Sequence, residues 1–230
     1  MIAAMPASHG WDTRHEAHQR NSGCFDMADH IGCGSCHGVC LAMSYTVRRV
    51  LPSEYSKYRT HLLALDKDSR YLRFGFAASD HIINRLCDTF EEKREEHVLF
   101  AVENSTLDFV AIGHVAITPD MELAFSVLQE YQGKGLGQKL MRRCIQWCRL
   151  NGHLTGCMVC LSRNATIRHM CKKHGIHMSS EDGETLGDIR LDDPSLNTVL
   201  NEASDMNQAV IDFITKRVRL PWAIQHKRRK

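Results

Sequence analysis

The segment whose residue types are best suited to binding a phosphate group is Gln132-Gly133-Lys134-Gly135-Leu136-Gly137. It stands between an apolar stretch, Leu123 to Leu128, and an amphipathic one, Leu136 to Leu150. Glycines let the backbone approach a ligand closely and adopt angles that other residues disfavour, and the free N–H groups at the start of a helix attract an anion. We therefore interpret this segment as a phosphate-binding loop that opens a helix.

Two common nucleotide-binding loops do not fit the segment. A Walker loop requires a glycine five residues before the Gly-Lys pair and Ser or Thr after it, whereas Leu128 and Gly135 stand at these positions. A dinucleotide-binding fingerprint that starts at Gly133 requires a third glycine where the chain has Gln138. The structural alternative is a glycine-rich turn without a ligand.

Upstream of the loop, the sequence predicts strands and helices in succession. Tyr45 to Val50 is typical of a strand, and Pro52 can open a helix that reaches about Leu65. Ser79 can cap a second helix. Three short apolar segments separated by turn residues then predict an antiparallel meander: Val98 to Val102, Phe109 to Thr118 and Met121 to Leu128.

Downstream of the loop, helices and strands are predicted to alternate. The helix over Leu136 to Leu150 has one apolar stripe, and its basic residues are expected to face away from it: Lys139, Arg142, Arg143 and Arg149. A buried strand over Cys157 to Leu161 and a helix from about Asn164 to His174 follow. Thr185 to Leu191 can form a last strand, and a helix is expected from Pro194 to Arg219, ended by Pro221.

Three separated segments resemble those of the GNAT superfamily of N-acetyltransferases, and the resemblance spans about Tyr45 to Leu191. The run from Gln132 to Gly137 fits the Q-x-x-G-x-G pyrophosphate loop of that superfamily. Met121 to Val127 is similar to its fourth strand, and Asn164 to Ile176 is similar to its N-x-x-A segment ending in Gly-Phe.

Two further features resemble the GNAT domains of bacterial protein-lysine acetyltransferases of the Pat type. They are the segment Leu72 to Gly75 and the glutamate Glu122 within its strand. This subfamily resemblance is the weaker of the two and does not identify the acceptor.

The resemblance implies a fold, a co-substrate and a set of binding residues. The fold is α/β (α+β), with a central mixed, mostly antiparallel sheet of splayed strands flanked by helices, here followed by a C-terminal helical extension. The co-substrate is acetyl-CoA, with the N–H of Val127 polarising the thioester carbonyl and the Asn164 side chain contacting the cofactor. Its pyrophosphate would be bound by Gln132, Gly133, Lys134, Gly135, Leu136 and Gly137.

Transfer to an amine needs a base, donors for the developing oxyanion, and often an acid for the departing thiolate. Glu122 lies on the strand implied to hold the thioester and is the candidate base, with partial burial expected; a surface glutamate is the alternative. Many GNAT enzymes have a tyrosine acid where this chain has Cys171, so this thiol is the candidate acid and a packed cysteine the alternative. His114 and His169 are alternative bases or structural residues.

The composition is that of a globular protein. The chain has 230 residues, of which 43% are hydrophobic, and its formal net charge of +2 creates no general attraction for nucleic acid. No stretch approaches the roughly 20 apolar residues of a membrane helix, and the N-terminus lacks the apolar core of a signal peptide. We therefore expect a cytoplasmic protein without membrane or nucleic-acid partners, with its ten cysteines mostly reduced.

Three parts are expected along the chain: a disordered, Cys/His-rich leader over residues 1–42, a GNAT domain over 43–192, and a C-terminal helix with a basic tail over 193–230. In the leader, Cys33 to His37 has the signature of c-type haem attachment, but that chemistry requires export. A zinc site is the other alternative, built from Cys24, Cys33, Cys36 and Cys40, or from three of these with His30 or His37. We assign no metal ligand.

The expected function is transfer of an acetyl group from acetyl-CoA to a primary amine, of a small molecule or a protein lysine, by direct attack. The alternative from a different class is a catalytically weak acetyl-CoA-binding sensor or regulatory module with a zinc-binding N-terminal segment. A longer acyl-CoA and a homodimer are both compatible with the sequence. The acceptor depends on the loops near Arg70 to Phe76 and Glu181 to Asp188, which pattern reasoning does not interpret.

Overall fold

The structure is a computed structural model that describes residues 45–117, 120–181 and 183–227. All of these residues belong to one compact unit. The expectations for residues 1–42, including the haem and zinc alternatives, lie outside the described residues, as does the end of the basic tail at 228–230.

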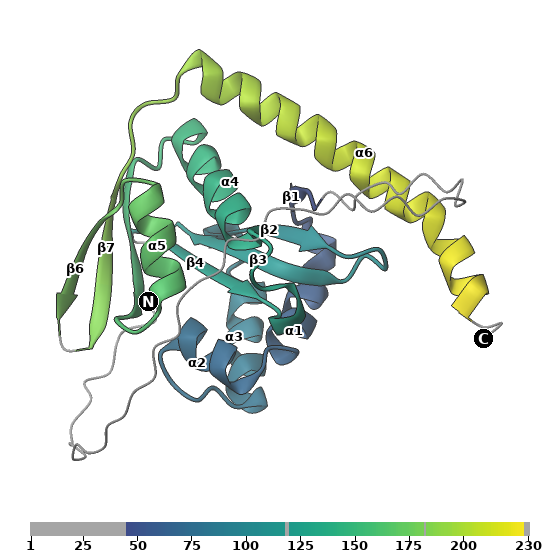
Figure 1. The fold of residues 1–230 in the computed structure, drawn as a ribbon, viewed down its shortest axis with the longest axis horizontal. Helices are drawn as coiled ribbons and strands as arrows, with labels where there is room; N and C mark the ends of the chain where they lie inside the picture. The colour runs from purple at the N-terminus through teal and green to yellow at the C-terminus, as the bar shows by residue number, and fades with distance from the viewer. Residues whose placement is uncertain (1–44, 118–119, 182, 228–230) are drawn as a thin grey trace, which may run out of the picture. The chain divides into compact units, whose positions relative to one another are not determined.

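The centre of the described unit is a seven-stranded sheet with the strand order β1-β2-β3-β4-β5-β7-β6 (Figure 1). All neighbouring strands pair antiparallel except β4 and β5, which pair parallel. The sheet is therefore mixed and mostly antiparallel, and the predicted meander of β2, β3 and β4 is confirmed. The strands are β1 Val47–Arg49, β2 His97–Glu103, β3 Phe109–Ala116, β4 Met121–Val127, β5 Thr155–Leu161, β6 His177–Glu181 and β7 Glu184–Arg190.

The parallel strands β4 and β5 pair over a short distance and then separate. Their register contains two residue pairs, Met121 with Gly156 and Glu122 with Cys157. On its other side, β4 stays paired with β3 as far as Val127. A side chain at Gly156 would collide with the Met121 carbonyl oxygen, so glycine permits the close approach where the strands do meet.

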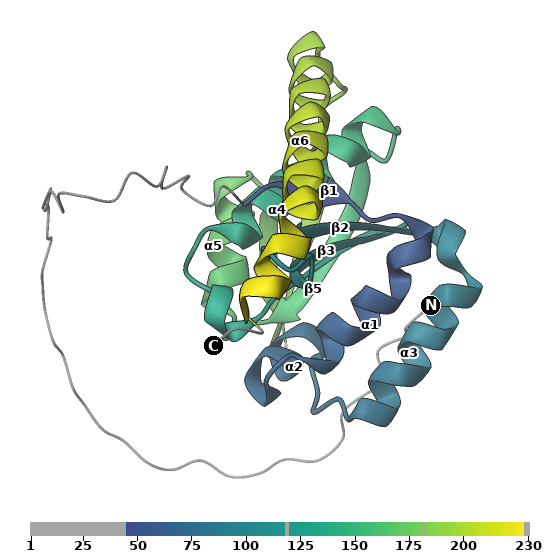
Figure 2. The same cartoon turned by 90° about the vertical axis from the view of Figure 1, so that its right-hand side faces the viewer.

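Helices cover both faces of the sheet because β2 is apolar on both faces. Phe100 packs in one core cluster with α4 (Leu136–Leu150), whereas its neighbour Leu99 packs in another with α1 (Tyr55–Leu63) and α3 (Asp80–Glu92). Successive residues of a strand point to opposite faces, so an apolar run is buried on both. Figures 1 and 2 show α4 on one side of β2 and β3, and α1 and α3 on the other.

Short 3-10 helices and three further helices complete the fold. The 3-10 helices are Pro52–Glu54, Arg94–Glu96 and Gln129–Tyr131, and the helices are α2 Lys67–Phe74, α5 Ala165–Lys173 and α6 Leu196–Lys227. The cap predicted for α3 forms, because the Ser79 side chain accepts a hydrogen bond from the backbone N–H of Ile82. The Asn164 side chain caps α5 in the same way, by accepting from the Ile167 N–H, and this cap was not predicted. α2 was not predicted from the sequence, and neither was β6.

Two predictions about individual residues of the helices are wrong. Pro221 does not end the last helix, because α6 continues to Lys227; the proline removes one backbone donor, and the turns on either side continue the helix. Arg143 does not face solvent: it is 2% exposed, and its guanidinium pairs with Glu202 and, at 3.5 Å, with Asp205 of α6. α6 lies over the side of α4 that the sequence alone predicts to be open.

A third prediction, of a buried strand at β5, is wrong for one face of that strand. Met158 is buried against α5, but Val159 is 49% exposed. Its neighbour on β7, Leu186, is 47% exposed. The sheet therefore has one face at β5 and β7 that the described helices leave open.

Candidate functional site

The glycine loop has the backbone shape expected for close approach of a ligand. Gly133 and Gly135 both have φ of +73°, a left-handed conformation that residues with a side chain rarely adopt. A Cβ atom placed on either glycine would meet no atom of the described chain within 4 Å, so the space beside them is open. The backbone of the loop therefore borders free volume at both glycines.

The first turn of α4 leaves its N–H groups available for an anion. Gly135 is the N-cap, and within the described residues no side chain caps this end of the helix. The first intrahelical bond runs from the Lys139 N–H to the Gly135 carbonyl, at 3.2 Å. Uncapped N–H groups at a helix start and the positive end of the helix dipole together favour a negative group.

The side chain of Gln132 fixes the position of the loop. Its Nε2 donates to the Val127 carbonyl at 3.1 Å and to the Ser69 Oγ at 3.1 Å. These bonds connect the loop to the end of β4 and to α2. Ser69 is a residue of this site that sequence reasoning missed, since nothing in its local pattern relates it to a residue 63 positions away.

The remaining loop residues have two different environments. Lys134 is exposed, and its Nζ lies 4.8 Å from the centroid of the Tyr131 ring, so its charge stays beside the loop. Leu136 is 2% exposed and belongs to the core, and a Cβ on Gly137 would lie 2.9 Å from the Met170 Sδ of α5. Close packing of α4 on α5 thus explains why residue 137 has no side chain, while the N–H groups of Leu136 and Gly137 belong to the first turn.

The separation of β4 from β5 leaves one side of β4 unpaired next to the loop. From Leu123 to Val127, β4 pairs with β3 alone among the described strands. Backbone groups that have no neighbouring strand are free to bond an extended ligand. Val127, at the end of this segment, is half-buried and accepts the Gln132 bond through its carbonyl.

The chain matches the model of the Acetyltransferase (GNAT) family over residues 57–176, just over half of its length. The match contains the glycine loop, the separating strands and Asn164. The chain belongs to this family. The fold class and the family predicted from the sequence are therefore confirmed, as is the enzyme class of an acetyl-CoA-dependent N-acyltransferase.

Solved structures of GNAT proteins have a similar fold at low sequence identity. The GNAT domain of S. lividans PAT has 19% identity and a TM-score of 0.52, over 63% of this chain and 89% of that domain. A putative acetyltransferase from Acinetobacter baylyi has 14% identity and a TM-score of 0.52, over 66% and 96%. The ribosomal-protein-S5-alanine acetyltransferase of Vibrio fischeri has 15% identity and a TM-score of 0.52, over 65% and 93%.

Glu122 of this GNAT protein lies where β4 and β5 still pair, and it is exposed. The expected partial burial is therefore not found. Through the strand register, Glu122 shares one face of the sheet with Cys157 of β5 and Asp188 of β7. Burial raises the pKa of the Cys157 thiol, and the negative charges of Glu122, Asp120 and Asp188 raise it further, so these three carboxylates surround one point of the open face.

Cys171 occupies a different environment from Glu122. It is 1% exposed and lies in the core, with Ile176 and Met170 of the same cluster. Burial raises the pKa of its thiol to about 11, and a buried thiol with a high pKa has no route to a leaving group at the surface. The surroundings of Cys171 are those of a packed cysteine.

Asn164 is 8% exposed and lies at the junction of β5 and α5. Its Oδ1 accepts the N–H of Ile167 at 3.2 Å, which caps α5. The capping bond holds the side chain in place, because an N-cap oxygen is fixed relative to the helix that it caps. The structure therefore gives Asn164 a structural partner in addition to the cofactor contact implied by the family resemblance.

His97 and His114 form a half-buried pair on the α1 and α3 face of the sheet. Nε2 of His114 lies 3.1 Å from Nδ1 of His97, and Nδ1 of His114 lies 3.5 Å from a guanidinium nitrogen of Arg73. Burial lowers the pKa of His114 well below its ordinary value, and the positive charge of Arg73 lowers it further. His169, the other histidine considered as a base, is exposed on α5, apart from this group.

His61 is a buried histidine that the sequence analysis did not single out. Its Nδ1 lies 2.9 Å from the Phe109 carbonyl oxygen and its Nε2 lies 2.8 Å from the Ser126 Oγ, so it connects α1 to β3 and β4. Burial lowers its pKa to about 4. A helix with a histidine among apolar residues carries no signal of such a distant partner.

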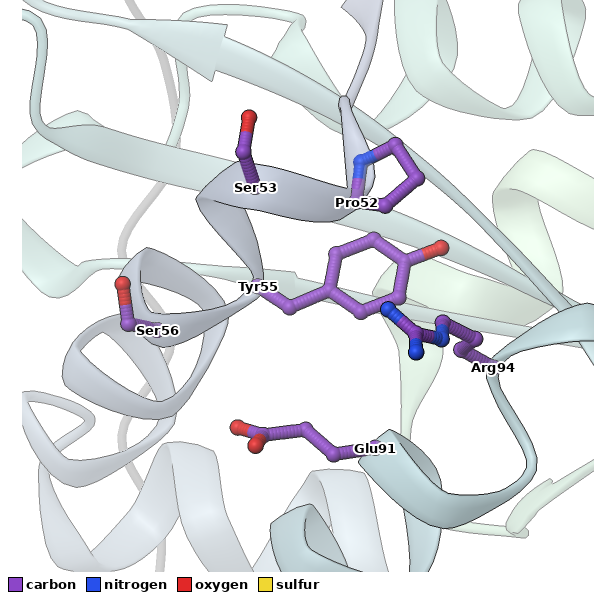
Figure 3. Close-up of a pocket in the computed structure, with 6 residues that line it drawn as sticks. All are labelled: Pro52, Ser53, Tyr55, Ser56, Glu91 and Arg94. Carbon is purple, nitrogen blue, oxygen red and sulfur yellow. The ribbon is translucent and has the colours of Figure 1, made fainter.

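A surface hollow of about 310 Å³ lies away from the loop (Figure 3). It is lined by Pro52, Ser53, Tyr55, Ser56, Glu91 and Arg94. None of the residues implied to bind cofactor or to act in catalysis lines it. We assign the site to the loop and β4, where backbone geometry fits a ligand, rather than to this hollow.

In the part of the chain that the structure describes, no group of three or more His, Cys, Asp or Glu residues is placed to hold a metal ion. No described helix combines the length and the apolar character needed to cross a membrane.

Proposed function

We propose that this GNAT protein transfers an acetyl group from acetyl-CoA to a primary amine, carried by a small molecule or by a protein lysine. The observation that carries the proposal is the open glycine loop directly beside the unpaired side of β4. A pyrophosphate on the loop and an extended pantetheine arm along the strand are the two parts of one ligand, and the two binding surfaces are adjacent in the chain and in space.

In this proposal the pyrophosphate accepts hydrogen bonds from backbone N–H groups of Gly133 to Gly137. Lys134 adds a positive charge beside them, and Gln132 holds the loop on β4 and α2. The N–H of Val127 polarises the thioester carbonyl, and Asn164 contacts the cofactor from the start of α5. These residue roles rest on the family resemblance together with the geometry of the loop and of the strand.

Glu122 is proposed as the base. The amine nitrogen attacks the thioester carbonyl carbon, its proton passes to the Glu122 carboxylate, and the carbon–sulfur bond breaks to release the thiolate of CoA. The exposure of Glu122 supports access by an acceptor from solvent. Because Cys171 is in the core, the thiolate is proposed to take its proton from water.

The open face beside Glu122 supports a cationic acceptor. Asp188 lies on the same face as Glu122, and Val159 and Leu186 provide half-exposed apolar surface next to it. An ammonium group on an aliphatic stem matches carboxylates that flank apolar side chains. A polyamine-like small molecule and a protein lysine both have this chemistry, and the proposal includes both.

We further propose that the protein acts in the cytoplasm. Each cysteine of the described chain is a free thiol: Cys87, Cys144, Cys148, Cys157, Cys160 and Cys171. Free thiols in this number suit a reducing compartment.

A second candidate function is a regulatory module that binds acetyl-CoA with little turnover. The burial of Cys171, at the position where many GNAT enzymes have an acid, is the observation that favours it. Acetyl-CoA binding without acetylation of any amine in a broad acceptor screen would support this alternative over the enzyme.

The test of the loop is calorimetric titration of acetyl-CoA into the full chain and two variants. Gly135→Glu places a side chain and a negative charge in the open space beside the loop, and we expect it to abolish binding. Gly152→Glu is the matched control, because Gly152 at the other end of α4 has φ of +77° and equally open surroundings. It carries the same backbone strain, and we expect it to bind acetyl-CoA like the wild type.

Equal binding by all three proteins would refute the assignment of the loop. Loss of binding in both variants would indicate a general effect of strain on α4 rather than a phosphate site. Circular dichroism of each variant, compared with the wild type, reports whether the fold is retained.

A further inference from the structure

The helix α6 exposes a wide apolar surface. Between Leu196 and Val218, eight large apolar side chains are each at least half exposed: Leu196, Val199, Leu200, Met206, Val210, Ile211, Ile214 and Val218. At 3.6 residues per turn, they occupy an arc of about 140° along roughly 33 Å of helix. We call these eight residues the α6 stripe.

The opposite side of α6, which packs on the rest of the unit, is largely polar. Glu202 and Asp205 pair with Arg143 of α4, and Lys216 donates to the Glu103 carbonyl at 3.0 Å. A surface helix normally buries its apolar side and exposes its polar side. α6 does the reverse, and exposed apolar surface on this scale marks an interaction site.

We propose that the α6 stripe is the interface of a homodimer, in which two copies of α6 pair antiparallel about a twofold axis near Asn207. This proposal does not depend on the proposed acetyl transfer. Asn207 lies within the arc of the stripe, midway between Leu196 and Val218. A polar residue at the centre of an apolar helix seam fixes register, which suits a position on the axis.

The area of the stripe matches that of a dimer interface. A standard protein interface buries about 800 Å² on each partner. Burial of one large aliphatic side chain removes on the order of 60–120 Å² of apolar surface. Eight such side chains therefore supply an area of the required size on one partner. A twofold axis places the same patch of the second copy against it, so the total buried area is twice as large.

The charges at the two ends of α6 favour the antiparallel arrangement. Asp192 and Asp193 precede the helix and are exposed, and Arg217 and Arg219 are exposed near its other described end. Antiparallel pairing about Asn207 brings the arginines of one copy beside the aspartates of the other. It also aligns the helix dipoles favourably, whereas parallel pairing would place like charges together.

A membrane surface is the less suitable occupant. Helices that lie on anionic lipid carry lysine and arginine beside their apolar face. One border of the stripe is instead uncharged, formed by Asn197, Ser204, Gln208 and Thr215. Between Leu196 and Val218, the arc of the stripe contains one cation, Arg217, which is fewer than such a lipid-binding helix carries.

Sedimentation equilibrium of the full chain tests the proposal. We expect the wild type to show a mass of about twice 26.2 kDa at micromolar concentration. Val210→Glu with Ile214→Glu places two charges within the stripe, and we expect the dissociation constant to rise at least about 30-fold. Gln208→Glu with Thr215→Glu adds the same charge on the polar border and should leave the constant within about threefold of the wild type.

A charge exchange tests the antiparallel direction. Arg217→Glu alone and Asp193→Lys alone should each weaken the dimer, and the double variant should restore most of the loss. Pairing about Asn207 places position 217 of one copy opposite position 197 of the other, four residues from Asp193. Circular dichroism confirms that each variant folds.

A monomeric wild type at 100 µM, or a stripe variant that still dimerises, would overturn the proposal. So would a monomer that binds vesicles of phosphatidylcholine and phosphatidylglycerol through the stripe. If each single charge variant weakens the dimer and the double variant does not restore its stability, the antiparallel arrangement is overturned.

Discussion

At the scale of single residues, Glu122 differs from the other acidic residues of the open face by its position at the end of the β4–β5 pairing. Its carboxylate is exposed to solvent on the face that it shares with Asp188. Position and access, rather than burial, support its proposed role as the base.

Glu122→Gln is expected to keep acetyl-CoA affinity and to lower kcat by about 10²- to 10⁴-fold, because the amide cannot accept the amine proton. The measurement is steady-state acetylation of an amine acceptor, combined with calorimetric titration of the co-substrate. The control is Glu184→Gln, which alters an exposed glutamate on the same face of β7. An unchanged kcat for Glu122→Gln would exclude Glu122 as the base.

Cys171→Ala tests the alternative roles of the buried thiol. If the thiol is packed, the variant should unfold at lower urea concentration, at a cost of about 1 kcal/mol, and keep kcat within about twofold. Cys148→Ala, at another fully buried cysteine, provides the comparison for a purely structural change. A large fall in kcat with unchanged stability would instead assign Cys171 to proton transfer.

At the scale of elements, α1 is attached to the sheet by a histidine that must stay neutral. His61 is 2% exposed and bonds β3 and β4 through its two ring nitrogens. Burial lowers its pKa from 6.5 to about 4, so between these values the unfolded chain binds a proton that the folded chain does not. Acid therefore destabilises the fold: this contribution is complete above pH 6.5 and is lost as the pH falls towards 4.

We expect His61 to account for about 2 kcal/mol of the stability lost between pH 7.5 and pH 5. Urea unfolding of the wild type and of His61→Gln at several pH values measures this contribution. The free energy of unfolding of the variant should depend less on pH than that of the wild type. His97 and His114 contribute in the same direction, because burial lowers their pKa values as well. His169→Gln, at an exposed position, is the control, and equal pH dependence of wild type and His61→Gln would contradict the prediction.

The elements also show where sequence patterns stop being informative. The glycine loop, the meander and α4 were predictable because apolar periodicity and turn residues coincide there. α2 was not, although Asp66 caps it and Gly75 ends it, because it buries no residue completely and four of its eight residues are charged. β6 was missed because His177–Glu181 lacks the alternation of a half-buried strand.

At the scale of the whole described unit, the site combines segments whose relation is set by tertiary packing. The family motifs identify the loop, β4 and Asn164, but Ser69 reaches the loop through α2, which no motif marks. Arg143 was placed in solvent because its partner Glu202 is 59 positions away. The sequence thus predicts residues within the family motifs better than residues whose partners lie on an element far away along the chain.

The polar attachment of α6 makes the outer side of this helix independent of the interior of the domain. Among the buried apolar residues of the described chain, α6 contributes Ala209 alone, so the interior is complete before this helix begins. Substitutions along its outer side can therefore accumulate without repacking the domain that holds the loop and β4.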